Sequence, residues 1–284
     1  MRKFIIRVFQ FLGISLGVYV MAYIACNYRN YYAFTHVLDC EVLSTCNSHE
    51  QCGIDPEIFK QYGNLNSIAS QPWVWEAKLR LLLSTGRCHP KYLIIDRGCH
   101  EILWGYTDDD VAQLVARFLP LQLLSGTCPY DINWDKVLHY ALGSRSFTTK
   151  WAAKPIGYRP IGTQLDIEGR VSEHFKNSIP PSNDDLSRFM GSLQSLVELA
   201  RSNGIEPILL STPKHTQYLA AEPCNVRELN KYITNFLVHS YNLRYLDYSN
   251  MVLGDDCFAD ADHLNPKGRA IFTRRLMEDL GFEE

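Results

Sequence analysis

The sequence lacks any strong compositional bias. Its 284 residues are 46% hydrophobic and 21% charged, which is ordinary for a globular protein. A disordered, collagen-like or coiled-coil chain would need a marked excess of a few residue types, so all three classes are excluded. The length is ample for a buried core. Because no stretch is repetitive or rich in Ser and Gly, we expect one folded domain.

An excess of positive charge is also absent. The chain has 28 Lys and Arg residues against 31 Asp and Glu residues, and its formal net charge is −3. A nucleic-acid binder uses surplus basic side chains to displace counterions from phosphates. We therefore expect no nucleic-acid partner.

Cysteine is sparse, and no Cys-x-x-Cys pair occurs among the nine cysteines. They are too few for a small disulfide-stapled protein. Cys88-His89 and Cys99-His100 are adjacent pairs whose side chains diverge, so we expect no structural zinc. Eight of the cysteines lie after residue 30, and the sequence does not choose among their pairings.

Acidic residues are missing from the first 29 positions, which contain Arg2, Lys3, Arg7 and Arg29. The uncharged run from Val8 to Tyr28 would form a helix of about 31 Å, the thickness of a bilayer hydrocarbon core. Because most of the basic residues precede the run, the N-terminus is expected in the cytoplasm.

We therefore predict a cytoplasmic tail at residues 1–7, a transmembrane signal anchor at 8–28, a linker at 29–38 and a domain at 39–284. The protein would be a single-pass protein of the inner (cytoplasmic) membrane, with its C-terminal domain extracytoplasmic or periplasmic. A cleaved signal ending at Val20-Met21-Ala22 and a lipoprotein modified at Cys26 are the alternatives. The apolar run is longer than the roughly 7–15 residues of a cleavable signal, which favours the anchor.

Short apolar runs alternate with helical patterns along the rest of the chain. Strands are predicted at residues 41–45, 92–95, 208–210 and 243–247, and helices at 73–83, 108–124, 183–203, 226–239 and 266–281. Asn183 is the expected N-cap of the third of these helices. Strands that alternate with helices predict an α/β fold. We expect a three-layer α/β/α sandwich with a mostly parallel sheet.

Chemistry in such folds gathers at the carboxyl ends of the strands. The segment after the first strand offers Ser48, and the segment after the last offers Asp260 three residues before His263. An Asp at this spacing can bond one imidazole nitrogen and leave the other as a base toward a serine. The alternatives are a purely structural loop before a helix and a metal site built from Asp260, Asp262 and His263.

Several blocks resemble those of the SGNH (GDSL-type) hydrolase superfamily. Asp260-x-x-His263-Leu-Asn265-x-x-Gly268 looks like its C-terminal block, and the run around Ser48 resembles the nucleophile block of membrane-anchored members. Residues 64–70, 92–98 and 208–215 are similar to further blocks, in the expected order. The resemblance extends over most of residues 39–284. It points to the cell-envelope branch, which includes D-alanine-transfer and O-acetyl-transfer proteins.

The resemblance implies that Ser48 is the nucleophile, His263 the general base and Asp260 the group that orients it. The chemistry would be acyl transfer through an acyl-enzyme, with no cofactor and no metal. The oxyanion donors would come from Ser48, Ala69, Ser70 and His100. Substrate contacts are expected from His49, Arg97 and His215.

The sequence also departs from the family pattern. Cys46 and Asn47 replace the usual Gly and Asp before the nucleophile, and this change removes the residue that best tolerates a strained turn. The Gly-x-Asn-Asp of the third block is absent, and residues 96–100 stand in its place. A missing oxyanion donor typically costs about 10²–10³ in rate.

We therefore expect an SGNH-like esterase or acyltransferase that acts on acylated cell-envelope glycan or another ester substrate. The N-terminal helix would bind the membrane, and a membrane acyltransferase is a candidate partner. The alternative is a non-catalytic accessory protein that binds glycan or a partner in envelope polymer modification. Residues 129–182 are expected to form either a lid or a solvated insertion.

Overall fold

The computed structural model describes residues 1–37, 39–66, 70–97, 134–142, 167–175 and 181–283. The predicted helix at 108–124 lies outside these residues, as does most of the segment 129–182. Within 129–182 the structure describes the helical residues 134–142 and 167–175.

Five parallel strands form one sheet in the order β2-β1-β3-β4-β5. Their bounds are β1 (Val42–Ser44), β2 (Tyr62–Asn64), β3 (Tyr92–Asp96), β4 (Glu206–Ser211) and β5 (Arg244–Asp247). Four of them coincide with the predicted apolar runs. β2 was not predicted, because three residues that include Gly63 and Asn64 show no strand pattern.

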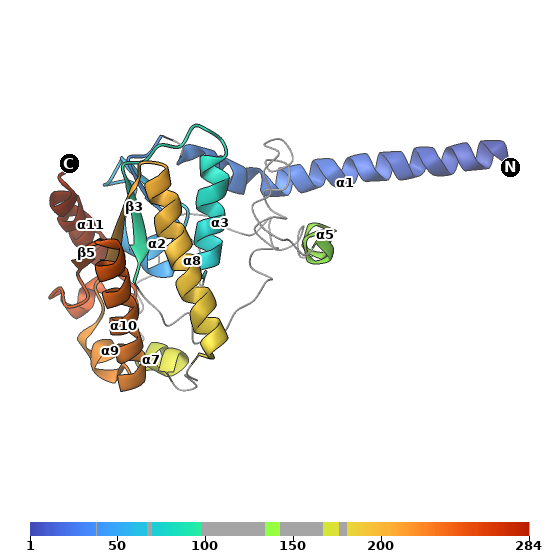
Figure 1. Cartoon of the computed structure of the whole chain (residues 1–284). Helices are drawn as coiled ribbons and strands as arrows, with labels where there is room; N and C mark the ends of the chain where they lie inside the picture. Colours follow the sequence, from blue (N-terminus) through green and yellow to red (C-terminus); the bar gives the residue numbers. More distant parts are fainter. Residues whose placement is uncertain (38, 67–69, 98–133, 143–166, 176–180, 284) are drawn as a thin grey trace.

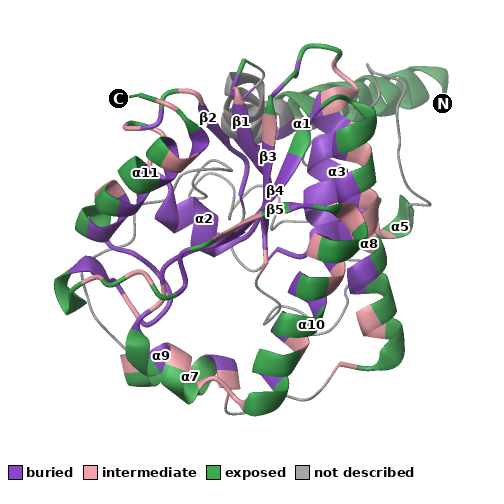
Figure 2. Ribbon diagram, turned by 60° about the vertical axis from the view of Figure 1, so that its left-hand side comes forward, coloured by how far each residue is buried: buried purple, intermediate pink, exposed green. Residues whose placement is uncertain are grey.

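Helices cover both faces of the sheet, which confirms the three-layer α/β architecture. α3 (Pro72–Leu83), α8 (Asn183–Ser202) and α10 (Cys224–Tyr241) lie on one face, and α2 (Ser48–Gly53) and α11 (Pro266–Leu280) on the other (Figure 2). The remaining described helices are α1 (Arg2–His36), α5 (Trp134–Leu142), α7 (Ile167–Phe175), α9 (Thr216–Ala221) and the 3₁₀ helix η2 (Asp255–Cys257).

The strands divide their side chains between two hydrophobic cores. Leu43, Leu93 and Leu209 pack with α3, α8 and α10. Ile94 and Ile208 belong to the second core, together with residues of α11. Alternate residues of a strand point to opposite faces, so apolar runs without polar interruption are what a doubly covered sheet requires.

The helix ends follow local capping chemistry. Ser182, not Asn183 as predicted, is the N-cap of α8, because its hydroxyl accepts the backbone N–H of Asp185. Pro266 begins α11 as expected, and Gly281 ends it in the left-handed region with φ of 79°.

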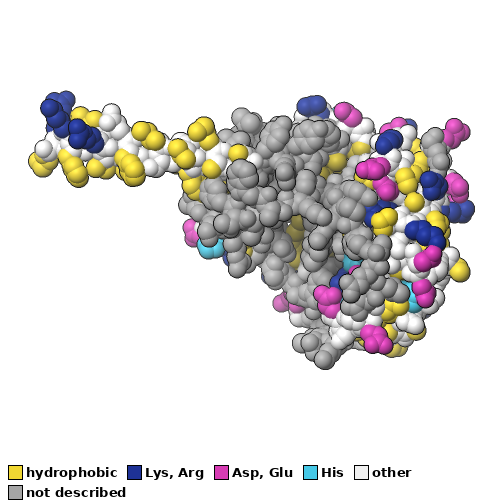
Figure 3. Space-filling model, turned by 180° about the vertical axis from the view of Figure 1, so that it is seen from behind, with side chains coloured by type: hydrophobic (Ala, Val, Ile, Leu, Met, Phe, Trp, Pro, Cys, Tyr) yellow, Lys and Arg dark blue, Asp and Glu magenta, His cyan; other side chains and the backbone are white. Residues whose placement is uncertain are grey.

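The N-terminal helix α1 projects away from the folded domain (Figure 1). Its segment Arg2–Tyr23 is long and apolar enough to cross a membrane, by length and composition. Phe9, Phe11 and Ile14 are each 69% exposed, and basic side chains gather at the tip (Figure 3). An isolated apolar helix of this kind serves either as a membrane anchor or as a signal sequence.

Candidate active site

The candidate nucleophile lies where the strand order reverses. β2 and β3 flank β1 on opposite sides, so the carboxyl end of β1 is the topological switch point, where open α/β sheets bind ligands. Ser48 is the first residue of α2, just after β1. Asn47 caps this short helix, and its side-chain oxygen accepts the backbone N–H of His49 at 2.8 Å.

The turn before Ser48 does not require a glycine. Asn47 has φ of −96°, and Cys46 is not among the described residues with positive φ. The Cys46 thiol instead ties the turn to β3. It donates to the carbonyl of Ile94 at 3.1 Å and accepts the N–H of Asp96 at 3.1 Å.

The segment before α11 forms a closed loop that carries the candidate base. Phe258 and Leu264 form an isolated antiparallel bridge, and the N–H of Ala259 donates to the carbonyl of His263 at 2.9 Å. The Asp260 carboxylate accepts the backbone N–H of Asp262 at 3.1 Å and that of His263 at 2.8 Å. Asp260 thus fixes the loop as well as the imidazole.

The rest of the motif anchors this loop to α11. The side-chain oxygen of Asn265 caps α11 by accepting the N–H groups of Lys267 and Gly268. A Cβ at Gly268 would lie 2.1 Å from the carbonyl oxygen of Cys257, so no larger residue fits there. The Asn-x-x-Gly spacing therefore has a structural cause.

The structure brings together Ser48, His263 and Asp260. His263 Nε2 lies 2.9 Å from Ser48 Oγ, across 215 positions of sequence. His263 Nδ1 lies 3.0 Å and 2.9 Å from the two carboxylate oxygens of Asp260. Ser48 and His263 are only 6% and 5% exposed. This is the hydrogen-bonded order of a serine, an imidazole and an orienting carboxylate.

A second carboxylate, not assigned to the triad from the sequence, faces the same imidazole. Asp262 Oδ1 lies 3.3 Å from His263 Nδ1, and Asp262 Oδ2 lies 2.8 Å from His49 Nε2. Arg170 of α7 donates from Nε to Asp262 Oδ1 at 2.7 Å. Arg170 has no signal in the sequence, because it lies 92 positions from Asp262 in a region without a clear pattern.

The electrostatics of the site follow from these contacts. Burial alone would lower the pKa of the His263 imidazole, but the carboxylates of Asp262 and Asp260 outweigh burial and raise that pKa to about 9. Burial also disfavours the charged form of Asp262. The nearby imidazoles of His263 and His49 outweigh that burial and hold the Asp262 pKa well below its usual value.

His49, which was expected to contact substrate, lies in the buried part of the site, and its substrate role stays a prediction. It is 2% exposed, and its two ring nitrogens face Asp262 at 2.8 Å and Asp96 Oδ2 at 3.4 Å. Asp96, at the end of β3, also accepts from the Asn47 side chain. Asp96 thus supports the turn that carries the nucleophile.

The other predicted contact residues serve the scaffold. Arg97 donates to Ser211 Oγ at 2.7 Å, and His215 caps α9 by accepting the N–H of Gln217 at 3.2 Å. The Ser70 hydroxyl donates to the carbonyl of Cys46 at 3.0 Å. The predicted substrate-binding roles of Arg97 and His215 stay predictions. Ala69 and His100 lie outside the described residues, so their predicted oxyanion roles stay predictions.

His49, Asp262 and His263 offer ligand atoms that lie within 4.8 Å of one another. Asp262 already accepts from His49 and Arg170, so a cation would compete with a guanidinium for the same carboxylate. The donor set suits a hydrogen-bonded network better than a metal site.

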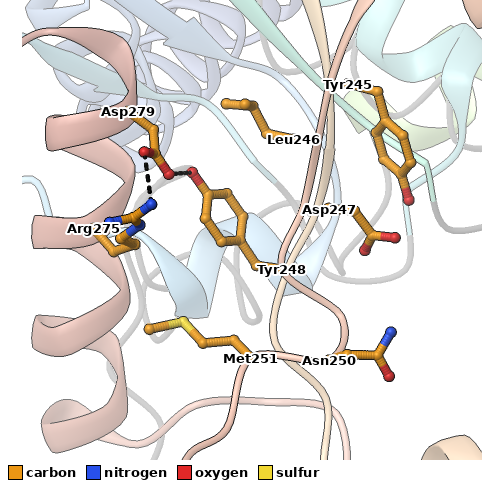
Figure 4. A pocket seen from close by; sticks show the side chains of 8 residues that line it. All are labelled: Tyr245, Leu246, Asp247, Tyr248, Asn250, Met251, Arg275 and Asp279. Atoms are coloured by element: carbon orange, nitrogen blue, oxygen red, sulfur yellow. Dashed lines mark hydrogen bonds and ion pairs between the residues drawn. The ribbon is translucent and has the colours of Figure 1, made fainter.

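A separate cavity of about 500 Å³ lies between β5 and α11 (Figure 4). Its walls include Tyr245, Tyr248 and Met251, and Arg275 pairs with Asp279 at 3.0 Å on one side. None of the triad residues lines it. We therefore do not assign the candidate chemistry to this cavity.

No protein-family model matches the chain, and no curated protein matches it in sequence. Two solved structures are similar to it, both with a TM-score of 0.42. A GDSL-like lipase from Bacteroides thetaiotaomicron is 14% identical, over 84% of this chain and 87% of that chain. A protein described as an acylhydrolase from Bacteroides fragilis is 15% identical, over 84% and 86%.

Proposed function

We propose that the chain is a membrane-anchored, extracytoplasmic ester hydrolase or acyltransferase that uses Ser48, His263 and Asp260 as its triad. The observation that carries the proposal is the 2.9 Å contact between His263 Nε2 and Ser48 Oγ, with Asp260 on the other ring nitrogen. Both polar side chains of this contact are buried, which is costly unless they are paired.

The proposed reaction begins when Ser48 Oγ attacks the carbonyl carbon of an ester. His263 Nε2 takes the hydroxyl proton and then gives it to the leaving alcohol, so that an acyl-Ser48 ester remains. Water or a sugar hydroxyl next attacks this ester, with His263 again as the base. Asp260 holds the Nδ1–H tautomer, which leaves Nε2 free to accept the proton.

The tetrahedral oxyanion would be stabilised by backbone N–H groups near Ser48. The backbone N–H of Ser48 lies in the first turn of α2, where amides have no acceptor within the helix. A second donor is expected from Ala69 or Ser70. The alternative of a non-catalytic accessory protein would follow if this donor set were incomplete.

Acylated envelope glycan is the proposed substrate class. It rests on the resemblance of the motif Asp260-x-x-His263 and on the apolar helix α1, which would place the domain outside the cytoplasmic membrane. The acyl acceptor, water or a glycan hydroxyl, decides between hydrolase and transferase.

The test uses the full chain in detergent micelles with a small acetyl ester as substrate. Ser48→Ala should reduce hydrolysis to the background rate, whereas Ser195→Ala, at a partly buried contact between α3 and α8, should not. Equal turnover by Ser48→Ala and the wild type would contradict the triad. No turnover by the wild type with any ester would favour the accessory role.

A further inference from the structure

We infer that Asp262 is a positioning residue for His263. Held by His49 and Arg170, its carboxylate keeps the imidazole in its orientation and stabilises its protonated form. This inference deepens the proposed function and rests on it. It assigns a separate role to each of the two carboxylates that face the same ring nitrogen.

The two carboxylates differ in their surroundings. The Asp260 side chain is 22% exposed, whereas the Asp262 side chain is 0% exposed. Charges interact more strongly in the low-dielectric interior than beside water. Asp260 accepts two backbone N–H groups as well as the ring, so it orients. Asp262 is the carboxylate whose charge acts on His263 most strongly.

The groups around Asp262 come from three further elements. His49 Nε2 of α2 donates to Asp262 Oδ2 at 2.8 Å, and the other ring nitrogen of His49 faces Asp96 of β3. Arg170 of α7 contacts both oxygens of Asp262, at 2.7 Å and 3.4 Å. His174 of α7 lies 3.7 Å away, and burial lowers its pKa to about 3, so it is neutral.

Arg170 opposes the effect of Asp262. Its guanidinium partly neutralises the carboxylate, and it also lies 4.0 Å from Asp260. Removing Arg170 therefore strengthens the negative field on the imidazole, whereas removing the Asp262 charge weakens it. The two changes should move the His263 titration in opposite directions. If Asp262 and Arg170 had only a structural role, their removal would not shift the His263 pKa in opposite directions.

The test is a titration of the histidine resonances by NMR in the full chain, labelled at the imidazole carbons, with His263→Gln to assign the signal. Asp262→Asn should lower the pKa of His263 by about 1 to 3 pH units. Arg170→Gln should raise it, and Arg170→Lys should restore the wild-type value. Asp255→Asn is the control, because Asp255 is 79% exposed and contacts His215 instead.

An unchanged His263 titration in Asp262→Asn would overturn the inference, and so would shifts of equal sign in Asp262→Asn and Arg170→Gln. If Asp262→Asn does not fold, the test uses Arg170→Gln and Arg170→Lys alone. The titration needs no activity. Opposite shifts of the His263 pKa, together with an unreactive Ser48, would support Asp262 as the positioning residue and reject the proposed function. A reactive Ser48 with an unchanged His263 pKa would support the proposed function and reject the role of Asp262.

A different part of the fold carries a second, independent inference. We infer that Cys40 and Cys88 form a disulfide that joins the start of the domain to the loop before β3. Both thiols are buried in the same hydrophobic core, with 9% and 1% exposure.

The parallel pairing of β1 with β3 brings these cysteines together. Val42 is in register with Tyr92, and the N–H of Lys91 donates to the carbonyl of Glu41 at 2.7 Å. Cys40 and Cys88 lie just before these pairs, and both are free thiols in this structure. The neighbouring Cys88 thiol and burial raise the pKa of Cys40, so the two side chains face each other in the core. A disulfide would bring the two sulfurs to a bond length of about 2.05 Å.

The oxidation requires an acceptor of electrons outside the cytoplasm. The two thiols lose two protons and two electrons as the Sγ–Sγ bond forms. A thiol–disulfide oxidoreductase takes up the electrons, and its own disulfide becomes a dithiol. The step belongs to folding, because both thiols are buried afterwards. It depends on the outward placement of the domain, since disulfides persist in oxidising compartments.

The test is peptide mass spectrometry of the full chain, alkylated in denaturant without reductant directly after isolation from membranes. We expect a linked peptide that contains Cys40 and Cys88, while the exposed Cys224 is alkylated. Cys88→Ser should release Cys40 for alkylation. Finding both cysteines alkylated in the wild-type chain would overturn the inference.

Discussion

At the scale of single residues, the candidate site is a chain of hydrogen bonds rather than three isolated side chains. The chain begins with Ser48, His263 and Asp260. It continues toward the interior through Asp262 and His49. Buried charges are tolerated only when each has a partner. This chain supplies those partners, and it makes the protonation of His263 the quantity on which the proposed reactivity depends.

The raised pKa of His263 leads to a prediction about pH. Only the neutral imidazole can take the Ser48 proton, and with a pKa of about 9 most of the imidazole is protonated at pH 7. The rate of inactivation by a fluorophosphonate should therefore rise roughly tenfold per pH unit and level off near pH 9. The measurement is the inactivation rate constant of the full chain at successive pH values.

His263→Gln is the control for this profile and should remove the rise. A wild-type rate that already levels off near pH 6.5, the ordinary range of a histidine, would show that the two carboxylates do not act on the imidazole as the structure indicates.

Part of the site could be predicted from local sequence, and part could not. Asp260 and His263 are three residues apart, so one turn joins them, and the polar run after β1 contains Ser48. Arg170 and Asp262 meet only through tertiary packing of α7, which no local pattern reveals. The sequence predicted substrate contacts for His49, Arg97 and His215, and it did not reveal the hydrogen bonds that these side chains make inside the protein.

At the scale of elements, α11 and the loop before it hold the base against the nucleophile. The Phe258–Leu264 bridge closes the loop, and Asn265 caps α11 directly after it. The position of α11 therefore determines the position of His263. Long apolar or amphipathic elements such as α8 and β4 were predictable from periodicity. The short β2 and α2 were not, because three or six residues carry no periodic signal.

The close approach at Gly268 gives a prediction for this element. Gly268→Ala places a Cβ against the backbone carbonyl of Cys257, which cannot give way without moving the loop. We expect a loss of about 1–3 kcal/mol in the free energy of unfolding. The measurement is denaturant unfolding of the full chain, followed by circular dichroism.

Gly191→Ala is the matched control. Gly191 is exposed within α8, and a Cβ added there would have no atom within 4 Å, so alanine should stabilise the helix by about 0.5–1 kcal/mol. Equal effects of the two substitutions would argue against the packing described between α11 and Cys257.

At the scale of the whole molecule, the near-neutral net charge divides into two parts. The first 29 residues carry four basic side chains and no acid, and the remaining 255 carry 24 basic and 31 acidic side chains. The basic part lies on the projecting helix α1, and the acidic part belongs to the folded domain. The charges flanking the apolar run predict that this domain faces away from the cytoplasm.

The exposed Cys224 allows this orientation to be tested. A membrane-impermeant maleimide should label Cys224 in spheroplasts whose cytoplasmic membrane is intact, because the domain is predicted to lie outside it. Peptide mass spectrometry should locate the label on Cys224, and Cys224→Ser should remove that labelled peptide. Labelling that appears only after lysis would place the domain in the cytoplasm.

The central claim is that Ser48 is an activated nucleophile, and covalent labelling tests it most directly. The full chain in micelles is treated with a fluorophosphonate at pH 9, digested and analysed by mass spectrometry. The account predicts one adduct, on Ser48, which is lost in Ser48→Ala and strongly reduced in His263→Gln. A folded wild-type chain without any adduct on Ser48 would contradict it.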